Sequence, residues 1–490
     1  MGARPGSHPD ARLEARKRLS QIPLGGLRRG TAALRAALQQ ELPGLDWITD
    51  APRLARLSQD FSWFSPVLKR RLQDHRGDIA VRPRSEDEIH RVVGACARRA
   101  VPITVRGAGT GNYGQVVPLQ GGLILDLSAF NAFGWVRGGS GRAQAGIRLA
   151  DFDRAAQALG WELRWLPSTF RAATLGGLFG GGFGGAGSIT YGPIAAAGNV
   201  LGARVMSVQA EPQVVELRGA EAMLVHHRWG TNGIVLELEV ALAPALPWVE
   251  MIATFDDFDA GLEFCVALNG ASPGIVKKEL AFMAAPIPGY FTLLAAHLPA
   301  GCHAALMLVA ESSEPALRNL VAAHGGHVHY RQDGDEVRAS KRTLIEYCWN
   351  HTTLQALKLD KGLTYIQSRF DPARQLEQVR SLHQALDPEV MMHLEFIRLT
   401  SGQATCSGLQ IVRYRSDERL EQIMQIYRDH GATINNPHVN TLEDGGKLRD
   451  MDRAAVSAAA AMASDAAVAM KQRFDPHGLL NPGKLRTRVS

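Results

Sequence analysis

Three glycines in the segment ITVRGAGTGNYGQ, residues 103–115, have the spacing of a nucleotide-binding turn. Gly109, Gly111 and Gly114 spell G-x-G-x-x-G after a β-branched run. A Rossmann dinucleotide site also needs a helix that opens within the motif and an acidic residue about 20 residues further on. The next residues, QVVPLQGG, have no helical period, and Asp126 lies at the end of the following apolar run. This context argues against a Rossmann fold, and the sequence has no Walker pattern G-x-x-x-x-G-K-[ST].

The same loop can bind phosphate without being a Rossmann motif, because consecutive backbone N–H groups in a glycine turn form a concave anion site. Its candidate residues are Arg106, Gly107, Ala108, Gly109, Thr110 and Gly111, and the charge of Arg106 could add to the attraction. The alternative is a flexible surface turn, which the glycines alone would also produce.

Two further glycine segments favour a ligand over a simple turn. In PSTFRAATLGGLFGGGFGGAGSITYG, residues 167–192, the glycines let backbone lie against a flat ring system without side-chain clash. Thr174 is placed to cap a short turn that Gly176 and Gly177 open. In WGTNGIVLELEV, residues 229–240, Gly230 and Gly233 come just before an alternating, strand-like run.

These loops must be carried by helices and strands that the sequence also predicts. Ser85 with Glu88 is a capping box in front of a helix, and residues 101–105, 122–127 and 233–244 have the composition of strands. Helices are expected over residues 31–41, 149–160 and 454–473. From about residue 248, short strands alternate with helices. The expected fold class is therefore α+β, with a second α+β domain after the glycine loops.

The composition is that of an ordinary soluble protein, with 490 residues, 46% hydrophobic and 21% charged. The net charge is +6, and no basic tract is interleaved with aromatic residues, so no nucleic-acid partner is expected. Five cysteines form no C-x-x-C pair, which is typical of a reducing compartment. The sequence shows no secretory signal, and the Ala-rich residues 454–470 are read as a soluble helix. We therefore expect a cytoplasmic protein without a transmembrane segment.

Four motifs occur in the same order as in a known family. They are R-G-x-G-T (106–110), P-S-T with A-T-L-G-G (167–177), G-T-x-G-I-V (230–235) and D-P-x-G-L-L-N-P-G-K (475–484). Together they resemble the vanillyl-alcohol-oxidase superfamily, whose members carry a PCMH-type FAD-binding domain. The resemblance implies a two-subdomain FAD-binding domain at 71–245 and an α+β cap domain for the substrate at 246–455. It also implies an N-terminal helical segment at 1–70 and a C-terminal segment, 456–490, that returns to the FAD domain.

The resemblance further implies where FAD would lie. The first loop would hold the pyrophosphate, the second would wrap the ribityl chain, pyrophosphate and flavin, and the backbone at Gly233 and Ile234 would meet the adenine side. Beyond the first loop, the residues expected to bind FAD are Pro167, Ser168, Thr169, Thr174, Gly176, Gly177, Gly184, Ser188, Tyr191, Gly233, Ile234, Asn481 and Lys484. We further expect that Lys484 or another cation balances the negative charge that grows at N1–C2=O of the reduced flavin.

The chain departs from some family members at two points. Thr110 stands where those members carry a histidine that binds FAD covalently, and the second loop has no cysteine, so we predict non-covalent FAD. The cap motif H-G-D-G-N-x-H of members that oxidise hydroxy acids is not found. The segment HGGHVHY, residues 324–330, shares only histidines and glycines with it and is expected to be a solvated loop. No metal site is predicted.

Candidate catalytic residues lie in the expected cap. They are His438 and Asn436 in INNPHVN, His351 in WNHTT, and Glu395 and Arg398 in MHLEFIRL. Each also has a structural interpretation, since histidine beside Asn or Thr can cap a helix and Asn-Pro is common in turns. We prefer His438 as the base that takes the hydroxyl proton, because a turn can direct its side chain into a pocket, whereas His351 lies at the start of a predicted helix.

The prediction is an FAD-dependent oxidoreductase that transfers hydride from an alcohol-type or hydroxy-acid C–H to flavin N5. Its partners would be a small-molecule substrate and either oxygen or an electron-transfer acceptor, and a homodimer is compatible with the sequence. Two alternatives stay open at this stage, an NAD(P)-dependent Rossmann dehydrogenase and a flavin-binding module without turnover.

Overall fold

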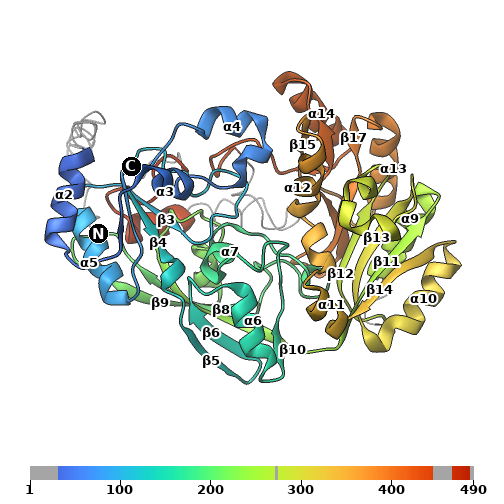
Figure 1. Ribbon diagram of the computed structural model, residues 1–490, viewed down its shortest axis with the longest axis horizontal. Helices are drawn as coiled ribbons and strands as arrows, with labels where there is room; N and C mark the ends of the chain where they lie inside the picture. The colour runs from blue at the N-terminus through green and yellow to red at the C-terminus, as the bar shows by residue number, and fades with distance from the viewer. Residues whose placement is uncertain (1–30, 271–273, 445–465, 486–490) are drawn as a thin grey trace, which may run out of the picture.

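The computed structural model describes residues 31–270, 274–444 and 466–485, which form two α+β parts that lie side by side (Figure 1). The first part contains a four-stranded and a six-stranded sheet, and the second contains an eight-stranded and a three-stranded sheet. The expected α+β class is confirmed. Within the described residues, no helix is both long and apolar enough to cross a membrane.

The first sheet carries the first glycine loop at the end of a strand. Its order is β1 (Trp47–Ile48), β2 (Ile79–Val81), β4 (Leu123–Asp126), β3 (Ile103–Arg106), and β2, β4 and β3 run parallel. Helices α2 (Thr31–Glu41) and α5 (Glu86–Arg98) pack on it through apolar side chains. The predicted strands at 101–105 and 122–127 and the helix that begins after Ser85 are confirmed.

The second sheet is antiparallel and supports the other two glycine segments. Its order is β5 (Phe133–Arg137), β6 (Ser140–Gln144), β10 (Ile234–Pro244), β8 (Val200–Met206), β9 (Val214–Arg218), and β7 (Trp161–Leu163) also pairs with β10. The helices α6 (Leu149–Gln157), α7 (Leu175–Gly181) and α8 (Ser188–Tyr191) lie between β6 and β8 in the order of the chain. Side chains of α6 and α7 share a core with this sheet, so the glycine-rich helix α7 has a fixed support.

The second part, which is called the cap below, is built on an antiparallel sheet. Its order is β14 (His327–Asp333), β11 (Trp248–Phe255), β13 (His303–Ala310), β12 (Lys277–Met283), β18 (His393–Arg398), β19 (Ala404–Gly408), β16 (Ser368–Arg369), β21 (Thr433–Ile434). One face shares a core with α9 (Phe258–Gly270), α10 (Glu314–Ala323), α13 (Gln375–Leu386) and α14 (Asp417–Asp429), which lie on the outer side of the cap (Figure 1). The other face packs against α12 (Asn350–Leu359) and the 3₁₀ turns η5 (Ile287–Tyr290), η6 (Thr292–His297) and η8 (Leu344–Tyr347). A small sheet of β15 (Leu363–Tyr365), β20 (Ile411–Arg413) and β17 (Val390–Met391) completes the cap.

The expectation of a loop at residues 324–330 is wrong. Residues from His327 onward form the edge strand β14, which pairs with β11 over Val249–Thr254. His327 and His329 point to solvent while Tyr330 is buried, which is the two-residue alternation of a half-exposed strand. The segment HGGHVHY has no local strand signal, and pairing with β11 decides its conformation.

Both ends of the described chain join its two parts. The N-terminal elements α3 (Ala51–Leu57), η2 (Phe61–Phe64) and α4 (Pro66–Leu72) run from the first sheet to the cap, where Thr364 donates to the carbonyl of Phe64. Residues 466–474 are helical, and the following segment pairs Leu480 with Ile103 of β3. The remaining short elements are η3 (Leu127–Ala129), η4 (Gly219–Leu224), η7 (Glu311–Ser313) and α11 (Gly334–Ser340).

Candidate functional site

A cavity of about 280 Å³ lies between the two glycine segments, the turn before β10 and four cap segments. The glycine-loop side is lined by residues 105–113, 115 and 116 and by many residues of 167–184, and the third wall by residues of 225–235. The cap side is lined by Trp349, Asn350, Gln367, Ser368, Arg369, Ser407, Gly408, Leu409 and Asn435. The cavity is therefore bounded by both parts of the chain.

The first glycine loop presents a row of unused backbone donors. The N–H groups of residues 108–112 donate to no other group in the described part of the chain. These residues line the cavity, and Gly109 has a φ of 70°, which turns the backbone into the left-handed region. Residues 108–111 are half-buried, so their N–H groups are open to the cavity and can bind an acceptor such as the oxygens of a pyrophosphate.

The structure gives Arg106 a different task from the predicted one. Its guanidinium donates to the carbonyls of Leu57, Gln59 and Ala108, at 3.0, 2.7 and 3.1 Å. It lines the cavity, but its donors are committed to fixing the loop against the segment that precedes η2. Asp60 and Asp126 lie close enough to favour the charged form of Arg106, which opposes the effect of burial on its pKa. Arg106 therefore shapes the loop.

The second segment has the cap that the sequence predicts. Thr174 is the N-cap of α7, and its Oγ1 accepts from the backbone N–H of Gly177 at 3.1 Å. A Cβ at Gly180, one turn further along, would meet nothing within 4 Å, so this wall of the cavity is open backbone. Such a surface fits a flat ring or an extended chain of a ligand.

The two glycine segments also approach each other too closely for side chains. A Cβ at Gly107 would lie 2.2 Å from Thr174 Oγ1, and a Cβ at Gly176 would lie 2.6 Å from the Cβ of Ala145. Glycine at these two positions is thus required by packing of the loops as well as by access for a ligand. Together, the open donors and the bare backbone fit FAD.

Most of the predicted FAD-binding residues line the cavity. They are Arg106, Gly107, Ala108, Gly109, Thr110, Gly111, Pro167, Ser168, Thr169, Thr174, Gly176, Gly177, Gly184 and Gly233. Ser188, Tyr191, Ile234, Asn481 and Lys484 are outside the lining. Ser188 accepts from the N–H of Gly185 within the second segment, and Ile234, the first residue of β10, is buried in the core of the first sheet. The ring of Tyr191 lies under the guanidinium of Arg164, 5.0 Å from its centroid.

The two C-terminal residues act behind the first loop. Asn481 Nδ2 donates to the carbonyls of Gln115 and Trp229, at 2.7 and 2.6 Å, and so ties the first loop to the turn before β10. The ammonium group of Lys484 is buried and has no hydrogen-bond partner in the described chain. Burial lowers the pKa of Lys484 to about 7, against the opposing attraction of Asp60. A Cβ at Gly114 would lie 3.7 Å from Lys484 Nζ, which places this amine behind the loop.

None of the predicted catalytic residues lines the cavity. His438 is buried, with Nδ1 2.8 Å from Ser65 Oγ, and its backbone N–H donates to Asn436 Oδ1, which is the expected Asn turn. Burial lowers the pKa values of both His438 and His351 to about 4. His351 is the second residue of α12, as its sequence predicted. The geometry therefore gives no support to either histidine as the base.

The two strand residues are also turned away from the cavity. Glu395 is fully buried and lies 2.6 Å from His393 Nε2, while Arg398 donates to the carbonyl of Gly402 at a hairpin turn. Both residues belong to strand β18. Their side chains belong to the cap interior and its edge.

Several cavity residues were missed because the contacts that bring them together are long-range. Asn350 Nδ2 donates to Asn112 Oδ1 at 2.9 Å, and Tyr113 Oη donates to Gln367 Oε1 at 2.7 Å. The ring of Tyr113 stacks on that of Trp229, with centroids 5.7 Å apart. The only local signal was the polar run NHTT after Trp349, which drew attention to Asn350 without giving it a role.

The charged side chains on the described part of the cavity wall are basic. Among its described lining residues there is no aspartate or glutamate, and the arginines are Arg106 and Arg369. Arg106 is committed to three carbonyls. Arg369 lies on β16 and is partly buried, and within the described chain its guanidinium forms no hydrogen bond or ion pair. Arg369 is therefore an uncommitted cation on the cap side.

Comparison with known proteins agrees with this site. A family model described as an FAD binding domain matches residues 77–217, which include both glycine segments. The chain is 24% identical over 443 residues to the glycolate oxidase subunit GlcD of Bacillus subtilis (strain 168), covering 83% of this chain and 88% of that one. It is 28% identical over 212 residues to an uncharacterised FAD-linked oxidoreductase of Mycobacterium tuberculosis (strain H37Rv), covering 40% and 45%.

Among solved structures, an alkyldihydroxyacetonephosphate synthase superposes with a TM-score of 0.67 and 14% sequence identity, over 92% of this chain and 84% of that one. At this identity the likeness concerns the fold. The matches confirm a PCMH-type FAD-binding domain and favour FAD over the nicotinamide alternative.

Proposed function

Because the chain belongs to the FAD-linked oxidoreductases with a PCMH-type FAD-binding domain, we propose that it oxidises the hydroxyl-bearing carbon of a small organic anion. The favoured substrate class is a hydroxy acid, with a simple alcohol as the alternative. In the reaction the substrate loses a hydride from carbon and a proton from its hydroxyl group, and a carbonyl compound is formed. Oxygen or an electron-transfer partner would then receive the electrons.

The residues that would hold FAD are those of the two glycine segments. The N–H groups of residues 108–112 would bind the pyrophosphate, and the bare backbone around Gly177 and Gly180 would face the rest of the cofactor. When bound, FAD supplies the acceptor for the hydride. Thr110 in the first loop and the cysteine-free second segment support non-covalent binding.

One observation carries the choice of an anionic substrate. Arg369 is an uncommitted cation on the cap side of a cavity whose described wall has no carboxylate. A guanidinium binds a carboxylate with paired, charge-assisted hydrogen bonds and thereby fixes the orientation of the substrate. The name of the glycolate oxidase relative supports the same class. The missing H-G-D-G-N-x-H motif means that the carboxylate would be recognised by other residues in this chain.

The experiment that tests the function uses purified protein with its own flavin. Acid precipitation should release FAD to the supernatant, and anaerobic titration with a panel of hydroxy acids, alcohols and sugars should bleach the flavin with a hydroxy acid. Bleaching by neutral alcohols only, with no response to any hydroxy acid, would contradict an anionic substrate. Location in the cytoplasm and assembly as a homodimer stay predictions.

Arg369→Met should raise the KM for the active hydroxy acid about 10- to 100-fold, because a hydrogen bond to a charged group is worth about 1.5–3 kcal/mol. Arg369→Lys should recover part of this loss, since it keeps the charge but not the paired donors. Arg413→Met is the matched control, because Arg413 lies outside the cavity lining on β20 and pairs with Asp360 at the surface. An unchanged KM in Arg369→Met would remove Arg369 from the substrate site.

A further inference from the structure

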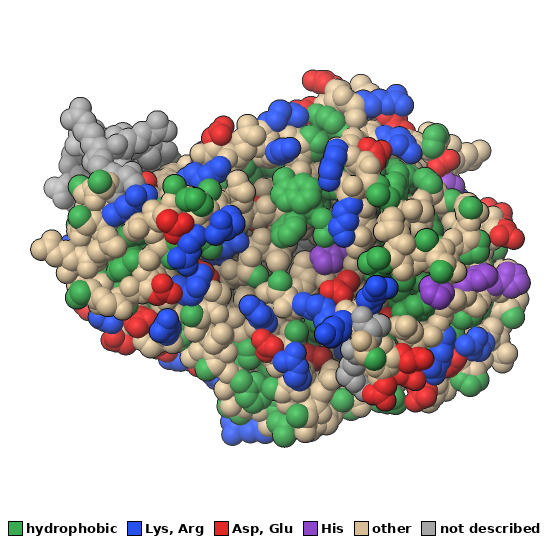
Figure 2. All heavy atoms as spheres, in the orientation of Figure 1, with side chains coloured by type: hydrophobic (Ala, Val, Ile, Leu, Met, Phe, Trp, Pro, Cys, Tyr) green, Lys and Arg blue, Asp and Glu red, His purple; other side chains and the backbone are tan. Residues whose placement is uncertain are grey.

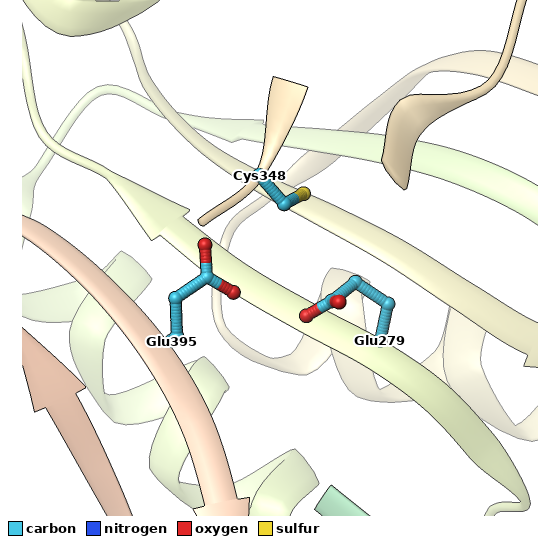
Figure 3. Close-up of side chains that lie close together, drawn as sticks. All are labelled: Glu279, Cys348 and Glu395. Carbon is cyan, nitrogen blue, oxygen red and sulfur yellow. The ribbon is translucent and has the colours of Figure 1, made fainter. Parts of the chain in front are cut away.

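Two glutamates face each other inside the cap, away from the cavity wall. Glu279 lies on β12 and Glu395 on the neighbouring strand β18, where Ala281 is opposite Glu395. Side chains two residues apart on a strand share a face, so Glu279 and Glu395 point to the same side of the sheet. Both are buried, and Figure 3 shows their carboxyl groups directed at each other with the thiol of Cys348 beside them.

The pair holds one residue of the cavity wall at two points. The backbone N–H of Trp349 donates to Glu395 Oε1 at 2.5 Å, and its indole Nε1–H donates to Glu279 Oε2 at 3.0 Å. Because one carboxyl binds the main chain and the other binds the ring, neither the backbone nor the side chain of Trp349 can turn independently.

Trp349 adopts a conformation that needs such support. Its φ of 53° with ψ of −140° is outside the regions that a residue with a Cβ normally occupies, and such strain persists only where surrounding contacts impose it. Trp349 lines the cavity, and the next residue, Asn350, donates to Asn112 of the first glycine loop. The strained residue is thus next to one of the contacts between the cap and the first glycine loop.

The hydrogen-bond partners, together with burial, indicate which groups carry protons. Burial lowers the pKa of His393 to about 3, so its ring is neutral. Its Nδ1 faces the carbonyl of Leu409 at 3.1 Å and donates to it, which leaves Nε2 as an acceptor. Thr352, which is also near Nε2, donates to the carbonyl of Tyr347 instead. The hydrogen between His393 Nε2 and Glu395 Oε1 therefore belongs to Glu395. Glu279 is placed to donate in turn to Glu395 Oε2, which has no other partner in the described chain.

The surroundings of Glu279 and Glu395 favour protonated, neutral carboxyl groups. In the described chain, neither carboxyl forms an ion pair with a lysine or arginine. Burial raises the pKa of Glu395 to about 8 and that of Glu279 well above its usual range, and it lowers the pKa of His393 to about 3. The other titratable groups nearby are the thiol of Cys348, whose pKa is also raised by burial, and Glu250, which acts on that thiol.

A metal ion is the competing interpretation of this cluster, since ligand atoms of Glu279, Cys348 and Glu395 lie within 4.8 Å of one another. However, the Cys348 thiol donates to the carbonyl of Leu344, and both carboxyls already accept hydrogen bonds from Trp349. A bound cation would also require deprotonated ligands. The donors around the cluster suit protonated carboxyls better.

We propose that Glu279 and Glu395 are positioning residues, a pair of neutral carboxylic acids that hold Trp349 in its strained conformation at the cap-side wall of the FAD cavity. Through His393 the same chain of hydrogen bonds reaches the carbonyl of Leu409, which lines the cavity as well. Two wall residues are thus fixed by one buried network. The proposal depends on the FAD site and is independent of the identity of the substrate.

Infrared difference spectra of the FAD-loaded protein test the protonation state. At pH 7 the wild type should show carbonyl bands of protonated carboxylic acids that Glu279→Gln and Glu395→Gln each remove. Stoichiometric metal in the purified protein that both variants lose would overturn the proposal, as would the absence of any such band. These readouts need no substrate, so they separate this proposal from the proposed function.

The positioning role is tested by comparing amide and alanine variants. Glu279→Gln and Glu395→Gln keep an acceptor for Trp349, so they should retain the wild-type tryptophan emission and visible circular dichroism of the flavin. Glu279→Ala and Glu395→Ala should shift both spectra and change the rate of sulfite addition to the flavin, with about a tenfold acceleration because the wall loosens. The added sulfite probes access to the flavin.

Glu250→Ala is the matched control. Glu250 is equally buried and accepts from Thr343 and Leu344, but it does not contact Trp349. The Glu250→Ala variant should be less stable than the wild type, but its flavin spectra should be unchanged. Alanine variants of Glu279 and Glu395 that behave like Glu250→Ala would overturn the proposal, and so would amide variants that are as impaired as the alanine ones. If an alanine variant fails to fold, the amide variants and Trp349→Phe, which lacks the indole donor, still provide the comparison.

Discussion

At the scale of single residues, the first glycine loop shows how an arginine and a glycine depend on each other. A Cβ at Gly109 would lie 2.1 Å from a guanidinium nitrogen of Arg106, and three carbonyls hold that guanidinium in place. Gly109→Ala should therefore push Arg106 away or distort the loop, and the positive φ adds a cost of about 1 kcal/mol or more. We expect folded protein with low flavin content, measured as the ratio of flavin to protein absorbance alongside far-UV circular dichroism.

Gly138 supplies the control for this substitution. It also has a positive φ, 56°, but a Cβ there would meet nothing within 4 Å at the β5–β6 turn. Gly138→Ala carries a similar backbone cost without a collision, so its flavin content should match the wild type. Full flavin content in Gly109→Ala would show that the loop tolerates a side chain and does not need its present shape to bind FAD.

At the scale of elements, the C-terminal segment acts as a tie between loops that the sheets alone do not join. Asn481 has a φ of 43° and gives both Nδ2 hydrogens to carbonyls, one from the first loop and one from the turn before β10. Asn481→Gly removes these donors while it accepts the same backbone conformation, so it isolates the two hydrogen bonds. We expect a stability loss of about 1–3 kcal/mol, because buried carbonyls are left unpaired, and weaker FAD binding.

Urea unfolding and titration of the apoprotein with FAD measure these two effects. Asn481→Asp should be worse than Asn481→Gly, because a carboxylate has no donors and would face two carbonyl oxygens. Asn131→Gly is the control, since Asn131 donates to the carbonyl of Ser128 at the surface and is not a lining residue of the cavity. Unchanged FAD affinity in both Asn481 variants would mean that the tie has no part in forming the site.

The elements themselves were largely predictable where their signals are local. Ser85 begins α5, Thr174 caps α7, and Pro244 ends β10, and each is a residue whose backbone or side-chain chemistry acts within one turn. The edge strand β14 was missed because its hydrogen bonds come from β11, which no local signal in HGGHVHY reveals. The predicted helix over 454–473 lies mostly outside the described residues, and its described end, 466–474, is helical.

At the scale of the whole molecule, the difference between local signals and long-range pairing explains which half of the candidate site the sequence predicts. The FAD side is made of contiguous glycine segments, so its residues can be read from motifs. The cap side is assembled by pairing of β16 with β19 and β21, which brings Arg369, Ser407 and Asn435 together from distant segments. Motif reasoning selected the histidines of the cap for their chemistry, whereas tertiary packing placed amides, hydroxyls and one arginine at the wall. On the face in Figure 2, basic and acidic side chains are intermixed.

A buried ion pair joins the cap to the FAD-binding part. Lys278 of β12 in the cap lies 2.7 Å from Glu162 of β7 in the FAD-binding part, with each side chain 3% exposed. Trp248 Nε1 donates to the other oxygen of Glu162 at 2.8 Å. Lys278→Met leaves a buried carboxylate with one neutral donor, so it should cost about 3–5 kcal/mol of unfolding free energy. Because the cavity needs walls from both parts, the same variant should bind FAD more weakly.

A double-mutant cycle distinguishes an ion pair from simple packing. Glu162→Gln should also be destabilising, since it leaves Lys278 buried without its ion-pair partner. Adding it to Lys278→Met should restore stability relative to the sum of the single effects, because the remaining amide is neutral and still accepts from Trp248. Urea unfolding followed by both tryptophan emission and flavin release would show whether the two parts separate together. Additive losses, with a single variant costing less than about 1 kcal/mol, would mean that apolar contacts alone hold the cap over the cavity.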